Sequence, residues 1–294
     1  MWELFALIAA FCFAVAETGE KLLLTKWFSK PVTLTIVLGV TGLLAAALIF
    51  ALQGFEWLGE TNALIALAAG VCYVLALWIY YKAVQTEEVS RIVPLFNMTI
   101  VFVAVLAAIF LNEVLSLTQY AGVFMILAGG TLISVKSKSS FSVSRKALGL
   151  MVAATFVFSL YLILTKYLLN YSDYWTVFAY ARTGGLLLIA PLLFIHWKDL
   201  KGVSRKFGVK AIAVGGLNEG INLIGVLAVT VAMSLGPATL VNALTATQAM
   251  MILVIAVALS VLKPDLLKEE LSRKTIGIKA IAILLIIAGV YFAT

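Results

Sequence analysis

Long apolar stretches, each separated from the next by a few polar residues, make up almost the whole chain. They lie near residues 2–24, 31–53, 62–85, 89–111, 117–135, 147–169, 174–196, 208–234, 237–262 and 275–293. A helix needs about 20 mostly apolar residues to cross the hydrocarbon core of a bilayer, and the connections are too short to hold a soluble domain. The pattern therefore predicts an all-α integral membrane protein with ten transmembrane helices.

The composition points to the same environment. Hydrophobic residues make up 63% of the chain and charged residues 12%, and the mean hydropathy is +1.11. In a soluble domain roughly a quarter of the residues are charged. The first apolar stretch has no basic start and holds Glu17, Glu20 and Lys21. We therefore expect it to be a membrane span and not a cleavable signal peptide.

The basic residues are unevenly distributed over the loops. All of the 21 Lys and Arg residues except Lys166 and Arg182 lie in or near the loops after the first, third, fifth, seventh and ninth stretches. Basic loops stay in the cytoplasm, so both termini are predicted to lie outside, as in a multi-pass protein of a prokaryotic inner membrane. The same bias accounts for the net charge of +7, and no nucleic-acid partner is expected.

The two halves of the chain repeat one another. Phe13 is followed eight residues later by Lys21, and the same spacing separates Phe158 from Lys166. Loops at matching places carry opposite charge, because the loop after the second stretch is acidic and the loop after the seventh is basic. This pattern predicts two inverted five-helix repeats around a central cavity, a recurring transporter design. Their bounds are 1–135 and 147–294, with a cytoplasmic linker at 136–146.

The stretch Asn112-Glu113-Val114-Leu115-Ser116, with the Gln and Gly that follow it, resembles the matching segment of the drug/metabolite transporter superfamily, specifically its ten-helix EamA type. Family members typically show Gly-Glu-Arg-Leu-Ser there, so Asn112 and Val114 depart from the pattern. The resemblance covers the whole chain. It implies a basket of eight helices around a central cavity, with the fifth and tenth helices outside, and transport of a small metabolite. Many relatives keep their termini in the cytoplasm, and the charged loops here predict the reverse.

Two charged residues lie deep inside predicted spans. A charge at the bilayer centre costs roughly 2.5–3.5 kcal/mol on the insertion scale, and such residues usually mark functional sites. Glu219 shares one helix face with Asn218 and Asn222, and Arg182 lies at a similar depth in the preceding span. The two can form a structural ion pair. Alternatively they form a split clamp, in which Arg182 takes an anionic group of a solute and Glu219 takes an ammonium or a proton.

Further residues are expected to bind the solute from the walls of the same cavity, together with Asn218 and Asn222. They are Tyr73, Asn97, Tyr161, Asn242 and Gln248. For aromatic residues in spans, packing is the competing explanation. Tyr73 is the strongest aromatic candidate, because it lies deep in its span and its hydroxyl needs a partner.

Two more acids lie in the cytoplasmic third of the first span. Glu17 and Lys21 have the spacing of a helix ion pair. The carboxylate of Glu20 would then have no ion-pair partner in this span. Burial in a low-dielectric site favours the neutral form of a carboxyl group. Glu17, Glu20 and Glu219 are therefore candidates for proton coupling or gating, with protons as the candidate coupling ion.

The sequence holds no cluster of metal ligands or catalytic groups. Cys12 and Cys72 lie inside spans as packing residues, and His196, the only histidine, ends a span. No metal, cofactor or catalytic residue is expected. The sequence favours a secondary active transporter of a small polar or zwitterionic metabolite, either amino-acid-like or an amine. It would work by alternating access, as a monomer or weak dimer in the lipid bilayer. The alternative is a membrane-embedded enzyme or lipid-handling protein.

Overall fold

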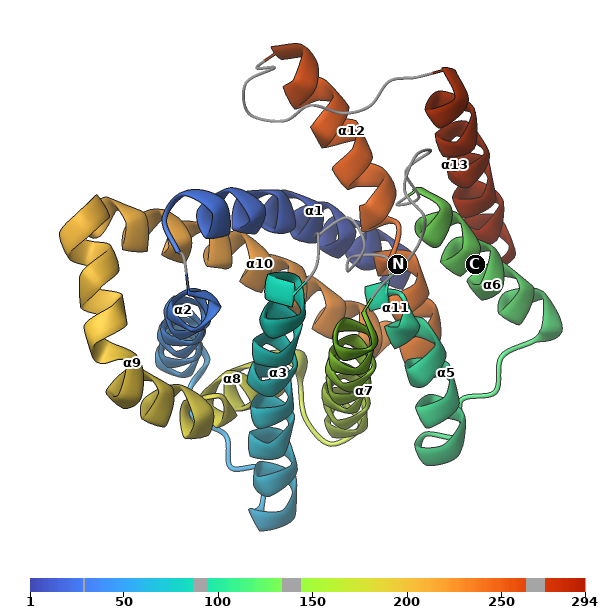
Figure 1. Cartoon of the computed structure of the whole chain (residues 1–294). Helices are drawn as coiled ribbons and strands as arrows, with labels where there is room; N and C mark the ends of the chain where they lie inside the picture. Colours follow the sequence, from blue (N-terminus) through green and yellow to red (C-terminus); the bar gives the residue numbers. More distant parts are fainter. Residues whose placement is uncertain (29, 87–94, 134–143, 263–272, 294) are drawn as a thin grey trace.

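The computed structural model describes residues 1–28, 30–86, 95–133, 144–262 and 273–293. The side chains of Lys21, Gln85, 256–262 and 273–276 lie outside that description. The structure is 88% helical, and its described part holds no strand, which confirms the all-α prediction (Figure 1). The helices are α1 Trp2–Lys26, α2 Pro31–Gln53, α3 Glu60–Thr86, α5 Met98–Phe110, α6 Leu117–Ile133, α7 Arg145–Leu168, α8 Tyr174–Gly184, α9 Leu186–Phe207, α10 Val209–Leu235, α11 Ala238–Thr245, α12 Gln248–Leu262 and α13 Arg273–Ala293.

Within the described residues, 7 helices are long and apolar enough to cross a membrane. Three shorter apolar helices are Met98–Phe110, Leu117–Leu132 and Gly277–Ala293. The first residues of the predicted fourth span and most of the predicted linker at 136–146 lie outside the described residues. The full count of ten spans therefore stays a prediction.

The outer surface of the bundle is apolar. On α2, Leu44, Leu48 and Leu52 recur four residues apart and are all exposed, and Val101 and Val105 do the same on α5. Residues four apart share one face of a helix. A face of large exposed aliphatic side chains is suited to lipid and not to water. Together with the long apolar helices, this surface identifies the chain as an integral multi-pass membrane protein.

Two predicted spans are interrupted. The predicted span 174–196 is divided into α8 and α9, and α9 contains Pro191 and has non-helical backbone angles at His196. Proline lacks the N–H that a helix interior requires, which favours a kink in this region. The predicted span 237–262 is divided into α11 and α12 at residues 246–247. The carboxylate of Asp173 accepts from the first turn of α8 and fixes where that helix begins.

Four helix pairs organise the bundle. The helix α1 packs along α10, α3 along α7, α6 along α13 and α2 against α8. In Figure 1 the pair α6 and α13 stands at one side of the bundle, and α3 lies beside α7 near its middle.

Glycines allow the helices of two pairs to approach closely, and the contacts show their relative direction. A Cβ atom on Gly122 would meet the backbone of Gly289, and one on Gly129 would meet the backbone of Ala282. The partner number falls as the α6 number rises, so α6 and α13 run antiparallel. In the same way, a Cβ atom on Gly39 of α2 would contact Ile189, and one on Gly42 would contact Arg182. The partner number again falls as the α2 number rises, so α2 and the α8–α9 segment also run antiparallel.

Candidate functional site

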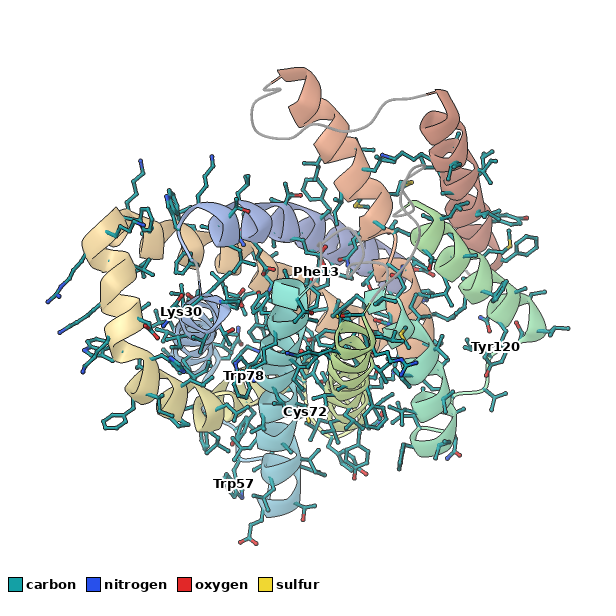
Figure 2. The ribbon with its side chains drawn as sticks, in the orientation of Figure 1. Phe13, Lys30, Trp57, Cys72, Trp78 and Tyr120 are labelled. Carbon is teal, nitrogen blue, oxygen red and sulfur yellow. The ribbon has the colours of Figure 1, made fainter. Side chains whose placement is uncertain are left out.

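A small cavity lies between α2, α3, α8 and α10. Its volume is about 20 Å³, which is room for about one water molecule. Both deep charges predicted from the sequence, Arg182 and Glu219, line this cavity together with Tyr73. In Figure 2 Cys72, the residue before Tyr73, is labelled on α3 in the middle of the bundle. The remaining lining residues are small or aliphatic: Leu38, Gly39, Gly42, Gly70, Val74, Ala181 and Gly185.

The guanidinium of Arg182 is held by aromatic rings. Its carbon Cζ lies 3.7 Å from the ring centroid of Tyr73 and 5.4 Å from those of Tyr161 and Phe178. Nη2 donates a hydrogen bond to the Tyr161 hydroxyl at 3.1 Å. Cation–π contacts contribute about 2 kcal/mol when desolvated, whereas burying an ion costs several kcal/mol. The Nε–H is buried without an acceptor, so the guanidinium keeps a donor available for an anionic group.

Glu219 is 1% exposed and is oriented by an amide. Asn222 Nδ2 donates to Glu219 Oε2 at 3.0 Å and lies 3.1 Å from the Tyr73 hydroxyl. No ion pair within 4.0 Å joins Glu219 to Arg182 among the described residues. The two opposite charges therefore face one cavity from α10 and α8 without direct contact. The two sequence-based alternatives, a structural pair and a split clamp, both stay predictions.

Glycines bring the charged helices close to the cavity. A Cβ atom on Gly70 of α3 would collide with the backbone of Ala181 and Gly185. A Cβ atom on Gly42 of α2 would lie 3.5 Å from Cδ of Arg182. Because these positions lack side chains, α8 can lie against α3 and α2 and present Arg182 inward. This packing role of Gly42 and Gly70 was not predicted from the sequence.

Four of the other predicted site residues form two groups. Tyr161 and Asn222 contact the cavity residues directly, as described above. The amide of Asn218 donates to the carbonyl of Ala16 at 3.1 Å, which joins α10 to α1. Gln248 donates to Glu17 at 3.3 Å and lies away from the cavity lining.

Asn97 and Asn242 are the two predicted site residues that lie in neither group. Asn97 begins α5, and a Cβ atom on Gly130 of α6 would lie 3.0 Å from its amide nitrogen. The amide nitrogen of Asn242 is buried without a partner in α11. Neither residue lines the cavity, so depth along a span does not by itself place a side chain at the site.

A second set of contacts closes one end of the bundle, and we call it the Lys166 bridge. Lys166 Nζ donates to the carbonyls of Met233 at 2.6 Å and Gly236 at 2.8 Å, and lies 3.8 Å from Glu113 Oε1. The Glu113 carboxylate accepts from the Ala238 N–H at 3.1 and 2.8 Å. It thus caps the start of α11. The bridge joins the segment before α6 to α7, α10 and α11, and it was not predicted from the sequence.

Replacing Lys166 by glutamine is expected to lower the free energy of unfolding by about 2–3 kcal/mol, because hydrogen bonds to charged groups contribute about 1.5–3 kcal/mol each. Chemical or thermal unfolding of the purified protein measures this. The matched control is Lys30→Gln, which removes the 2.7 Å ion pair between Lys30 and Asp199. The Lys30 side chain is 59% exposed. Exposed pairs contribute about 0.2–1 kcal/mol. Equal losses in the two variants would contradict a structural role for the bridge.

Comparison with known proteins identifies related sequences. Residues 1–135 match the sequence model of the EamA-like transporter family. A protein of Sinorhizobium sp, described as an uncharacterized transporter in the cobO 3' region, is 29% identical over 137 residues. Those residues make up 46% of this chain and 96% of that protein. The match confirms, over the first part of the chain, the resemblance to EamA-type transporters.

The fold is also found among solved structures. One of them, described only as the crystal structure of a protein, superposes with a TM-score of 0.72 at 17% identity. The superposition covers 100% of this chain and 95% of the other. At that identity the likeness shows the fold alone.

Proposed function

On the premise that residues 1–135 are EamA-like, we propose that this chain is a secondary active transporter of a small polar or zwitterionic metabolite. The solute is amino-acid-like or an amine. The Sinorhizobium relative is described as a transporter, which is consistent with a role other than catalysis. The proposed membrane is the prokaryotic inner membrane.

The observation that carries the proposal is the pair of opposite charges across one cavity. Arg182 offers a buried donor without an acceptor, and Glu219 is buried and oriented by Asn222. A zwitterion satisfies both charges at once, with its carboxylate at Arg182 and its ammonium at Glu219. The ring of Tyr73 lies against the guanidinium and would form a wall of the site. The cavity has room for about one water, so the solute can enter only after neighbouring helices separate.

Two features of the packing support an inverted repeat. In the repeat assignment α1 corresponds to α7, and α3 to α10. The structure packs α1 on α10 and α7 on α3, which is the same contact with the halves exchanged. The corresponding helices α6 and α13 also run antiparallel, since Gly122 lies against Gly289 and Gly129 lies against Ala282. Two similar halves in opposite orientations can open alternately to the two sides of the membrane.

Uptake into proteoliposomes tests the proposal. We expect saturable uptake of at least one member of a panel of amino acids and amines, and we expect an imposed pH gradient to change its rate if Glu17, Glu20 or Glu219 carries a coupling proton. A matching shift in thermal stability should identify the same solute. The proposal fails if no panel member moves and Glu219→Gln changes neither thermal stability nor any ligand-induced shift.

Labelling of single cysteines tests the predicted orientation. In a variant without Cys12 and Cys72, cysteine is introduced at Asn62, which is partly exposed, or at Gly202, which is exposed. A membrane-impermeant maleimide added to intact cells is expected to label the cysteine at position 62, and to label that at 202 only after lysis. The basic residues around 202 predict a cytoplasmic location. The opposite labelling pattern would reverse the orientation and place both termini inside.

A further inference from the structure

The exposed surface of α9 changes from apolar to basic at the kink. Before the kink, Phe194 is 88% exposed and Ile195 is 69% exposed. After the non-helical backbone angles at His196, the exposed charged side chains are all cationic, and in Figure 2 long side chains tipped with nitrogen extend outward from α9. We call this surface the basic face, and its residues are Lys198, Lys201, Arg205 and Lys206.

Trp197 stands at the boundary between the two surfaces. It is 47% exposed, and the Lys201 Nζ lies 5.4 Å from the centroid of its ring. Tryptophan is enriched where the hydrocarbon core of a bilayer meets the headgroups, because its ring is apolar and its N–H is polar. The change from apolar to basic at Trp197 therefore marks the membrane interface. The basic face then lies at the level of the lipid headgroups.

The opposite side of this part of α9 is anchored in the protein. Val203 is buried, and Leu200 and Phe207 are partly buried, in one apolar cluster that also contains Phe28. Apolar residues on one side of a helix and charged residues on the other make it amphipathic. Because the apolar side is packed against the bundle, the helix cannot turn about its axis. The basic face is therefore held pointing outward.

The charges of the basic face are not neutralised within the described part of the chain. The one acid of α9 is Asp199. Its carboxylate accepts a hydrogen bond from Lys30 at 2.7 Å and lies 3.0 Å from Nδ1 of His196, so it already has two partners. Among the described residues, no carboxylate forms an ion pair within 4.0 Å with any residue of the basic face. Four positive charges thus face outward beside the membrane interface.

We propose that the basic face binds an anionic phospholipid through the phosphate of its headgroup. Clusters of Lys and Arg on an amphipathic helix that borders a span attract anionic lipids. Trp197, Lys201 and Arg205 follow one another at four-residue intervals and so share one side of the helix. The planar guanidinium of Arg205 can bind a phosphate with two hydrogen bonds, Lys201 adds a second charge, and the indole of Trp197 lies against the glycerol and the first methylene groups. No residue of this face lines the cavity, so the site is separate from the proposed transport site.

Phosphatidylglycerol and phosphatidylcholine with the same acyl chains provide the test, because they differ in the net charge of the headgroup. The full chain is purified in a non-ionic detergent, and the affinity for each lipid is measured by native mass spectrometry. The wild-type protein is expected to bind phosphatidylglycerol at least about 30-fold more tightly, since each cation at the headgroup contributes about 5-fold. The double variant Lys201→Gln with Arg205→Gln is expected to remove most of this preference. Glutamine keeps the helix propensity of the residues it replaces, and both positions are exposed.

The matched control is Arg145→Gln with Lys146→Gln, which removes two exposed cations at the start of α7 and should keep the preference. If the first double variant does not fold, Lys198→Gln with Lys206→Gln replaces it and should also reduce the preference. Equal wild-type affinities for the two lipids overturn the proposal. So does an equal loss in the test and control variants, because the net charge of the protein and not this surface then attracts the lipid. Glycerol 3-phosphate bound as tightly as phosphatidylglycerol would make the ligand a free phosphate ester and overturn the assignment to a lipid.

Discussion

Replacing Arg182 by methionine is expected to weaken solute binding by at least about 30-fold, because truncating one partner of a buried charged contact costs 2 kcal/mol or more. Methionine retains an unbranched apolar side chain that can still pack between the rings of Tyr73 and Tyr161. It removes the Nε–H that is buried without an acceptor and the charge that faces an anionic group. Affinity for the solute found in the panel, measured on the purified protein, gives the result directly.

Arg182→Lys is the informative comparison for that variant. Lysine keeps the charge and loses the planar group that lies 3.7 Å from the Tyr73 ring, so an intermediate loss is expected. A structural role predicts a different pattern. If Arg182→Met and Glu219→Gln each unfold the protein and the double variant is stable again, the two charges form a structural pair and bind no solute.

Gly70→Val is expected to be the most destabilising substitution at the cavity. A Cβ atom there would collide with backbone atoms of Ala181 and Gly185. A flexible side chain could relieve such an overlap by changing its rotamer, but backbone atoms cannot. Overpacking usually costs 1–3 kcal/mol, and we expect about 3 kcal/mol here, a fall in Tm of about 6–12 °C. Thermal unfolding followed by circular dichroism measures this change.

Gly149→Ala is the matched control for the glycine prediction. No atom lies within 4 Å of a Cβ built on Gly149 of α7, and alanine favours the helix by up to about 1 kcal/mol. Its Tm is expected to stay the same or rise. If Gly70→Val is as stable as this control, α3 and α8 do not depend on close contact, and the account of how Arg182 is positioned is wrong.

The sequence predicted the helices and the deep charges well, because both follow from the cost of placing polar groups in lipid. Apolar stretches of span length have no other stable form, and Arg182 and Glu219 stand out as charges inside them. The interruptions were harder to predict. Residues 246–247 divide a predicted span without a proline or glycine at that point, so no local signal marked it. Pro191 was a signal, and it lies in the kinked helix α9.

Contacts between distant segments could not be read from the chain. Asn97 was predicted from its depth and Asn242 from the helix face that it shares with Gln248. Whether either side chain faces the cavity depends on how its helix is rotated against its neighbours. The role of Lys166 likewise depends on the carbonyls of residues 233 and 236, and that of Glu113 depends on the N–H of Ala238.

The Lys166 bridge bears on how fast this protein can cycle. Its contacts connect the segment before α6 to three helices of the second half, so separating the halves at that end requires the Glu113 carboxylate to leave the start of α11 and the Lys166 ammonium. Breaking such bonds absorbs heat before water replaces them. The turnover rate should therefore rise steeply with temperature, and a single glutamate would set much of that activation enthalpy.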